Sequence, residues 1–207
     1  MQAGITGSDG ASHNGMWDMT IASIVPGLRL AAPRDGDQVK RQLREALDVD
    51  DAPTVIRFPK GDVGPAVPAV RRQGSVDVLH ETSAESCDLL VVGVGAFASL
   101  GVEVAEKLEA QGHSVTAVDP RWVLPVSDDL VELARTAGAV AVVEDNLVSG
   151  GVGAAVTLAL REAGLSTAVH LHGIPKRFLD HASRGQVLEG LGLTADAVAT
   201  SLASRLR

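Results

Sequence analysis

The chain has 207 residues, of which 45% are hydrophobic and 21% charged, and its formal net charge is −8. This length suits one large or two small domains and is enough to bury a core without disulfides or metal ions. The acidic balance argues against a nucleic-acid partner, and no apolar run approaches the roughly 20 residues that span a membrane. Aromatic residues make up only 2% of the chain, which also excludes stacking platforms for nucleic-acid bases.

Cysteine usage and the N-terminal sequence bear on the compartment. Cys87 is the only cysteine, which excludes an internal disulfide and a cysteine-rich zinc site. No motif surrounds it, so we expect a buried small side chain. Asp9, His13 and Asp18 stand where an export signal needs an apolar run, and we therefore expect a cytoplasmic protein.

The first 62 residues have the pattern of the end of an α/β unit. A Gly-rich polar stretch over residues 4–15 predicts a loop, and residues 28–32 predict a short strand. Asp35 and Gln38 form a capping pair before a helix, and residues 54–58 predict a second strand. Two strands make a poor sheet alone, which indicates an incomplete part. The next 25 residues, 63–87, are proline-containing and weakly periodic, and we expect a linker there.

Strand and helix patterns alternate in the remainder, 88–207. Apolar runs predict strands at 89–94, 115–119, 139–144 and 168–171. Ser127, Ser183 and Thr194 stand at helix starts, Ser183 with Gln186 as a capping box. This alternation predicts the α/β class, with a mainly parallel sheet and helices on both faces.

Three polar side chains are the main candidates for function. Asp9 and His13 lie between glycines on the first loop, where a backbone approaches a ligand closely and the side chains handle protons or hydroxyls. Lys60 follows the strand that ends at residue 58, and ligands of α/β sheets lie at such ends. From spacing alone, a solvated turn and an exposed lysine remain open as alternatives.

Other motifs carry weaker signals. Residues 93–97, GVGAF, match part of a dinucleotide fingerprint, but packing of strand against helix explains them more simply. Residues 149–153, SGGVG, precede a helix and could hold an anion on backbone N–H groups. His170 and His172 share one strand face without a third ligand, which favours a structural role; His80, His113 and His181 show no metal-site spacing either.

Four segments, in register, resemble the 1-deoxy-D-xylulose-5-phosphate synthase family of the transketolase superfamily. They are DGASHNGMWD at 9–18, RFPKG at 57–61, WVLP at 122–125 and GGVG at 150–153. The resemblance implies a transferase that uses thiamine diphosphate and Mg²⁺ to join pyruvate to glyceraldehyde 3-phosphate with loss of CO₂. It also implies a cytoplasmic homodimer that feeds isoprenoid, thiamine and pyridoxal synthesis, with no nucleic-acid or membrane partner.

The same resemblance implies roles for the three candidates. Asp9 matches the residue that binds the acceptor's hydroxyls, and His13 matches the active-site histidine. Lys60 matches a basic residue, often arginine, that grips the acceptor's phosphate; lysine keeps the charge without the bidentate fork. Gln2 departs from the family, which has an arginine there.

The metal-binding GDG motif, the activating glutamate and the stacking aromatic of the family are absent. We therefore expect 1–62 to be the tail of the thiamine-diphosphate-binding (pyrimidine) α/β domain, 63–87 a linker and 88–207 a transketolase C-terminal domain. Alone, this chain is expected neither to bind the cofactor tightly nor to form product. The alternatives are a non-catalytic dimerisation module, part of another transketolase-like enzyme and, more remotely, a nucleotide-binding protein using GVGAF.

Overall fold

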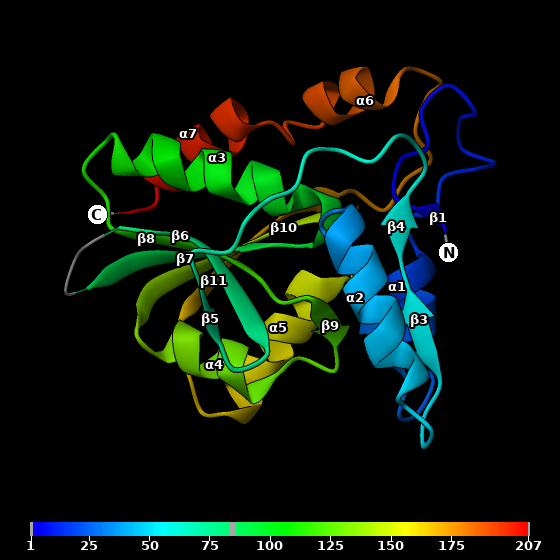
Figure 1. Ribbon diagram of the computed structural model, residues 1–207. Coiled ribbons are helices and arrows are strands. Elements are labelled where there is room, and N and C mark those ends of the chain that lie inside the picture. The colour runs from blue at the N-terminus through cyan, green and yellow to red at the C-terminus, as the bar shows by residue number, and fades with distance from the viewer. Residues whose placement is uncertain (1, 83–85, 207) are drawn as a thin grey trace.

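The computed structural model describes residues 2–82 and 86–206, with residues 2 and 3 described through their backbone (Figure 1). Its centre is a six-stranded sheet, and four neighbouring strands from residues 87–174 run parallel in it. Two further strands add to one edge, each antiparallel to its neighbour. In spatial order the strands are β11 (Ala168–Ile174), β10 (Ala137–Leu147), β7 (Cys87–Gly93), β8 (Val115–Asp119), β6 (Val76–Glu81) and β5 (Arg71–Gln73).

Helices cover both faces of this sheet (Figure 1). Ala141 and Val143 of β10 pack in one apolar cluster with α3 (Ala98–Glu109) and α7 (Ala195–Ala203), whereas Val140 and Val142 pack in another with α4 (Asp128–Arg135) and α5 (Val152–Glu162). Because successive strand residues face opposite sides, a strand covered on both is apolar throughout. The remaining helices of the second part are η1 (Gly95–Phe97), a 3₁₀ helix before α3, and α6 (Arg184–Gly190).

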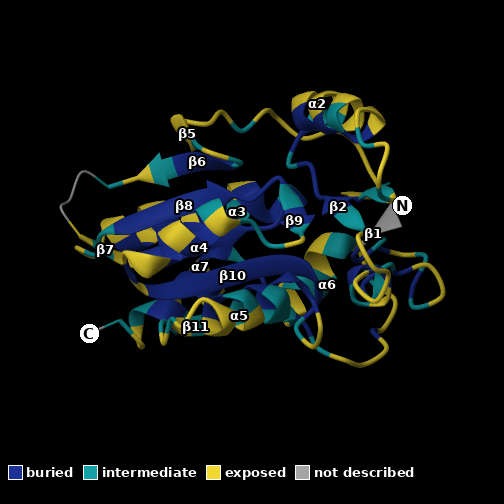
Figure 2. Cartoon of the chain, turned by 90° about the horizontal axis from the view of Figure 1, so that it is seen from below, coloured by how far each residue is buried: buried dark blue, intermediate teal, exposed yellow. Residues whose placement is uncertain are grey.

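The predicted helix starts are confirmed. The Ser127 hydroxyl accepts from the Leu130 N–H at 3.3 Å, and the Thr194 hydroxyl accepts from Ala197 at the same distance. Ser183 and Gln186 form both bonds of the capping box. Asp35 likewise caps α2 (Gly36–Leu47), whose outer face is exposed (Figure 2).

The strands of the first part form two small sheets, and one strand from the second part joins one of them. β1 (Gln2–Ala3) pairs in parallel with β4 (Phe58–Pro59) as a separate two-stranded sheet. β2 (Arg29–Ala31) and β3 (Thr54–Ile56) run parallel, and β9 (Trp122–Leu124) joins β2 antiparallel. β9 and the five-residue helix α1 (Asp18–Ala22) were not predicted, because neither is long enough to show a periodic pattern in the sequence.

The expected linker requires a correction. Residues 71–73 and 76–81 lie within it, yet they form β5 and β6 of the main sheet. Asp77 is a charged residue in a strand with four consecutive buried positions, and His80 follows it, so the pattern is not apolar throughout. The nearest charged partners of these side chains are distant in sequence: Arg34 pairs with Asp77 at 2.7 Å, and Glu109 pairs with His80 at 2.8 Å.

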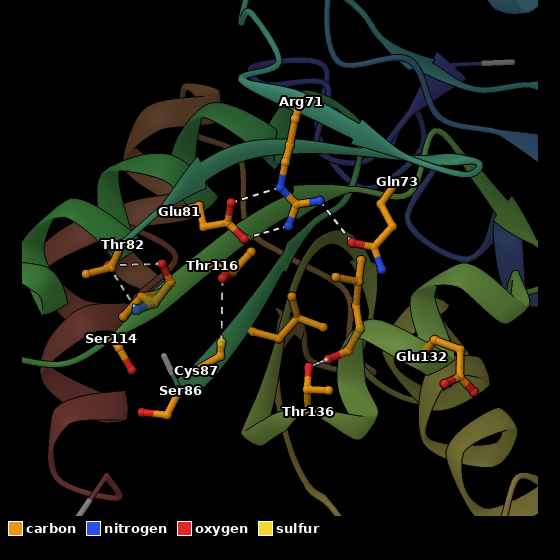
Figure 3. A pocket seen from close by; sticks show the side chains of 13 residues that line it. Arg71, Gln73, Glu81, Thr82, Ser86, Cys87, Ser114, Thr116, Glu132 and Thr136 are labelled. Atoms are coloured by element: carbon orange, nitrogen blue, oxygen red, sulfur yellow. Dashed lines mark hydrogen bonds and ion pairs between the residues drawn. The ribbon is translucent and has the colours of Figure 1, made fainter. Parts of the chain in front are cut away.

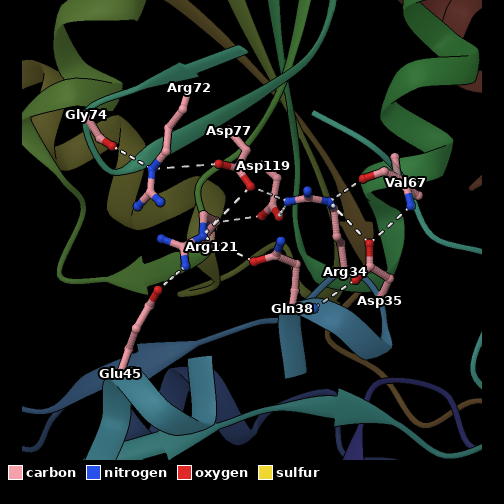
Figure 4. Close-up of polar contacts among 10 residues, drawn as sticks. All are labelled: Arg34, Asp35, Gln38, Glu45, Val67, Arg72, Gly74, Asp77, Asp119 and Arg121. Carbon is pink, nitrogen blue, oxygen red and sulfur yellow. Dashed lines mark hydrogen bonds and ion pairs between the residues drawn. The ribbon is translucent and has the colours of Figure 1, made fainter. Parts of the chain in front are cut away.

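A buried ionic network joins the two parts of the chain (Figure 4). Arg34 Nη1 donates to carboxylate oxygens of Asp77 and Asp119, both at 2.7 Å, and Arg34 Nε donates to the Val67 carbonyl. Arg121 extends the network by pairing with Glu45. Burial of Asp119 outweighs its bonds to Arg34 and raises the pKa of Asp119 to about 6.

Within the described residues, no helix combines the length and apolarity needed to cross a membrane.

Candidate functional site

The carboxyl ends of β1 and β4 lie side by side, and this brings two sequence candidates together. The loop over residues 4–15 follows β1, and Lys60 follows β4 directly. The Lys60 ammonium pairs with the Asp9 carboxylate, and this contact lowers the pKa of Asp9, first through the hydrogen bond and then through charge. With Lys60 about half exposed and Asp9 a third exposed, both groups can exchange this contact for a ligand.

The loop itself is ordered by its own bonds. Gly4 and Gly15 form an antiparallel bridge at its base, with N···O distances of 3.1 and 2.8 Å. The Asn14 side-chain oxygen accepts from the backbone and hydroxyl of Thr6 at 3.0 and 3.2 Å. Gly10, at a φ of 74°, lies in a turn that leads to His13. The polar stretch is therefore a built loop and more than a solvated turn.

His13 is exposed on this loop. Its Nδ1 lies 3.0 Å from the Ser12 hydroxyl, and His13 is the smallest of the contributors to the lowered pKa of Asp9, after Lys60. All three predicted site residues thus lie in one accessible region. The backbone of Gln2 pairs with Phe58 in β1, whereas its side chain lies outside the described residues.

Side chains from distant segments contact the loop, and sequence reasoning missed their role. The Asp145 carboxylate, from β10, accepts from the Ile5 N–H at 3.2 Å. Arg184 donates to the Ile5 carbonyl at 2.7 Å, and His181 Nδ1 lies 3.2 Å from the Ser8 carbonyl. Figure 1 shows the segment before α6 beside the N-terminal loop. One feature of the sequence could have indicated this role: Asp145 lies near the carboxyl end of a buried parallel strand, where ligands of α/β sheets bind.

Gly4→Ala is expected to destabilise the protein by more than about 1 kcal/mol, since Gly4 has a φ of 62° and a Cβ there would overlap the Asp145 carboxylate. Gly164→Ala is the matched control, because Gly164 has a φ of 73° with nothing within 4 Å of its Cβ position. Urea unfolding of both variants is the measurement. Equal losses would show that the Asp145 contact adds nothing to backbone strain.

The SGGVG motif serves an internal anion, which corrects the expectation of a bound one. The Glu144 carboxylate accepts from the N–H groups of Val152 and Gly153 at 2.8 and 2.9 Å, at the start of α5. Burial raises the pKa of Glu144 to about 7 despite these two bonds. The donors that an external anion would need are therefore taken.

Gly93 of GVGAF serves packing of β7 against α3, as the simpler interpretation of the motif expects. A Cβ on Gly93 would approach the Ala98 backbone to 2.8 Å, and one on Gly101 would approach the Gly93 Cα to 3.3 Å. β7 and α3 therefore need small residues where they meet.

Cys87 is half-buried, where the sequence analysis expected a buried side chain. It lines a cavity of about 250 Å³ at the amino ends of β7 and β8 (Figure 3). Its Sγ lies 3.6 Å from the Thr116 hydroxyl, and burial raises the pKa of the thiol, which disfavours the reactive thiolate. Arg71 in the same cavity is engaged by Glu81 and Gln73.

The histidines form no metal site in the part of the chain that the structure describes, where no three His, Cys, Asp or Glu side chains could hold an ion. His170 and His172 lie on β11, and burial followed by the charge of Arg205 lowers the pKa of both. Their neutral forms fit a structural role.

Comparisons with known proteins place this chain in a family. Residues 79–198 match the family described as "Transketolase, C-terminal domain", and residues 1–65 match "Transketolase, pyrimidine binding domain". The 1-deoxy-D-xylulose-5-phosphate synthase 2 of Streptomyces avermitilis is 59% identical over 208 residues, covering 99% of this chain and 32% of the relative. The 1-deoxy-D-xylulose-5-phosphate synthase of Mycobacterium avium is 56% identical over 204 residues, covering 96% and 32%. The chain spans about a third of the length of these relatives.

Solved structures share the fold. One described as "Split gene transketolase, inactive beta4 tetramer" matches with a TM-score of 0.80 and 29% identity, over 95% of this chain and 63% of that chain. Transketolase from Campylobacter jejuni matches with a TM-score of 0.77 and 18% identity, over 98% of this chain and 30% of that chain. The second likeness shows the fold alone.

The chain belongs to the transketolase family, a family of transferase enzymes, and its α/β fold is the one expected from the sequence. Within that family, its resemblance to the C-terminal portion of 1-deoxy-D-xylulose-5-phosphate synthase is confirmed by the curated relatives.

Proposed function

We propose that this chain is the acceptor-binding part of a 1-deoxy-D-xylulose-5-phosphate synthase, which joins pyruvate to glyceraldehyde 3-phosphate with loss of CO₂. The observation that carries the proposal is the accessible Asp9–Lys60 pair at the ends of β1 and β4. Lys60 binds the acceptor phosphate as a point charge, and Asp9 accepts from the acceptor hydroxyls. His13, exposed on the same loop, donates to the reacting oxygen and transfers its proton.

In this proposal residues 1–62 are the tail of a pyrimidine-binding domain. Residues 88–207 form the C-terminal domain, and strands β5 and β6 belong to its sheet. The linker is the part of residues 63–87 that lies outside these two strands. The protein works in the cytoplasm as a homodimer. Other transketolase-like reactions are the alternative, and the choice of acceptor distinguishes them.

Thiamine diphosphate with Mg²⁺ supplies the carbanion chemistry of this reaction when bound. The residues present do not fit its metal and diphosphate end, since the sequence has no GDG motif and the described residues contain no three-ligand metal cluster. We therefore assign no cofactor ligand in this chain. The proposal is that the chain alone neither binds the cofactor tightly nor forms product.

A chimera tests this function. The chain replaces the aligned segment of the Streptomyces avermitilis relative, and product is measured from pyruvate and glyceraldehyde 3-phosphate. We expect the chimera to be active. We expect the isolated chain to form no product and to show no micromolar cofactor binding by calorimetry.

In the chimera, Lys60→Ala is expected to raise the KM for glyceraldehyde 3-phosphate roughly tenfold to a hundredfold, because a hydrogen bond to a charged group is lost.

Two variants serve as controls for Lys60. Lys60→Arg keeps the charge and is expected to retain most of the acceptor affinity. Lys40→Ala removes an exposed lysine that pairs with Asp37 on α2, and it is expected to leave the KM unchanged. If Lys60→Ala and Lys40→Ala give the same KM, the proposed phosphate contact is wrong.

A self-associating module is the second candidate function, and the distribution of exposed apolar side chains favours it. Among the described residues, eight of the ten exposed large hydrophobics lie between residues 21 and 70: Ile21, Ile24, Val25, Leu43, Leu47, Phe58, Val63 and Val70. Exposed apolar side chains are thus concentrated in this part of the chain, and a surface rich in them is typical of one that another protein covers. A second copy of the chain is the occupant that we propose.

Light scattering of the isolated chain is expected to give a mass above that of the 21.3 kDa monomer. Ile24→Lys, at a side chain 78% exposed, is expected to shift the mass towards the monomer. Leu158→Lys, on α5 and outside residues 21–70, is the matched control and is expected to leave the mass unchanged. A wild-type monomer at high concentration would contradict self-association.

A further inference from the structure

We propose that Asp145, Arg184 and Arg57 are positioning residues that hold both ends of the loop over residues 6–14, and with it Asp9 and His13, in one geometry. The consequence for catalysis rests on the function proposed above, whereas the effect on the loop does not. Asp145 and Arg184 come from the second part of the chain, so the C-terminal domain sets the shape of a site carried by the first.

The start of the loop is held through Ile5, which is buried. Asp145 Oδ1 accepts from the Ile5 N–H at 3.2 Å, and Arg184 Nη1 donates to the Ile5 carbonyl at 2.7 Å. Asp145 Oδ2 and Arg184 Nη2 pair with each other at 2.5 Å. One ion pair therefore satisfies both backbone groups of Ile5, the residue directly before residues 6–14.

The end of the loop is held through Gly15 and Met16. Arg57 Nη2 donates to the carbonyls of Gly15 at 3.2 Å and of Asp145 at 2.7 Å, and its Nε donates to the Asp18 carboxylate. The Leu147 N–H, also from β10, donates to the Met16 carbonyl at 2.9 Å. The same strand end thus fixes the chain on both sides of the loop.

The tip of the loop has a third contact from the second part. His181 lies 3.2 Å from the Ser8 carbonyl, and its ring occupies the space that a Cβ on Gly10 would need. Asp9 stands between these two loop residues. Base and tip are therefore both in contact with the C-terminal domain.

Burial strengthens the bonds that hold the two ends of the loop. The side chains of Asp145 and Arg57 are each only 4% exposed, so water competes weakly for their bonds. Asp9 and His13, by contrast, are accessible and have few contacts of their own. Because a displacement of about 1 Å can lower a rate by two orders of magnitude, the buried bonds set the geometry on which the exposed side chains depend.

Asp77→Asn is the matched control for Asp145→Asn. Asp77 is equally buried, pairs with an arginine and joins the same two parts of the chain, but it does not touch the loop. In the full chain, Asp145→Asn is expected to accelerate amide hydrogen exchange about tenfold at Ile5 and over residues 6–14, while Asp77→Asn leaves these amides unchanged. Equal acceleration in the two variants, or none in Asp145→Asn, overturns the proposal. Arg184→Gln, at a side chain 26% exposed, replaces Asp145→Asn if that variant does not fold.

The chimera provides the catalytic readout. Asp145→Asn is expected to raise the KM for glyceraldehyde 3-phosphate about tenfold with the KM for pyruvate unchanged, whereas Asp77→Asn changes neither. An unchanged acceptor KM, in a chimera where Lys60→Ala does raise it, overturns the positioning role. If Lys60→Ala has no effect, the proposed function fails, and hydrogen exchange alone still decides whether Asp145 holds the loop.

Discussion

Replacing Arg34 with methionine is expected to lower the free energy of unfolding by about 3–5 kcal/mol at neutral pH, the usual result of leaving buried charges without a partner. One guanidinium serves Asp77 and Asp119, whose side chains are 4% and 0% exposed. Without it, both carboxylates lose their closest cation, and the nearest remaining guanidinium nitrogens, of Arg72 and Arg121, lie 3.9 Å from Asp77. Urea unfolding measures the loss, and Arg29→Met, which breaks an exposed pair with Asp51, is expected to lose at most about 1 kcal/mol.

The deficit of Arg34→Met should depend on pH. Asp119 has a folded pKa of about 6, above its ordinary 3.8, so its protonated form stabilises the fold below pH 4 and this contribution is lost as pH rises through 6. Removing Arg34 raises that pKa further. The variant is therefore expected to lie closer to wild type at pH 5 than at pH 8. A deficit that is the same at both values would contradict the assigned role of Asp119.

Glu144 is expected to give the second large effect, through pH. Its folded pKa is about 7 against an ordinary 4.5, so the stability from its protonated form is present below pH 4.5 and is lost as pH rises through 7. Between pH 5 and 8 wild type should lose on the order of 3 kcal/mol relative to Glu144→Gln, which cannot ionise. The free energies of unfolding of both proteins across this range are the measurement.

The matched control for Glu144→Gln is Glu132→Gln. Glu132 is an exposed residue of α4 that pairs with Arg135, and the hydrogen bond from Arg135 lowers its pKa. Any change in slope from this variant should be small and of the opposite sign. If Glu144→Gln and wild type run parallel in pH, Glu144 does not change protonation in this range.

Local patterns predicted most of the second part because the signals there are local. The apolar runs of β7 and β10 and the caps at Ser127, Ser183 and Thr194 need only neighbours in sequence. β6 was missed because the charge of Asp77 is paired most closely with Arg34, 43 residues away, while Arg72 and Arg121 lie farther off at 3.9 Å. β9 and α1 are too short to show a period.

The candidate site divides in the same way. Asp9, His13 and Lys60 stand in short motifs that can be recognised along the chain. Asp145 and Arg184 contact Ile5 across separations of 140 and 179 residues, so no local pattern could connect them to the loop. The SGGVG motif was recognised correctly as a set of N–H donors, but the anion that it binds is the chain's own Glu144.

The placement of β9 beside β2 has a consequence for biosynthesis. Until Trp122–Leu124 has been synthesised, one edge of the β2–β3 pair has no strand to cover it. At about 5–20 residues per second, the ribosome needs roughly 3 to 14 s to go from the end of β3 to the end of β9. During that interval the nascent chain exposes an uncovered strand edge, with which a strand of another chain can pair.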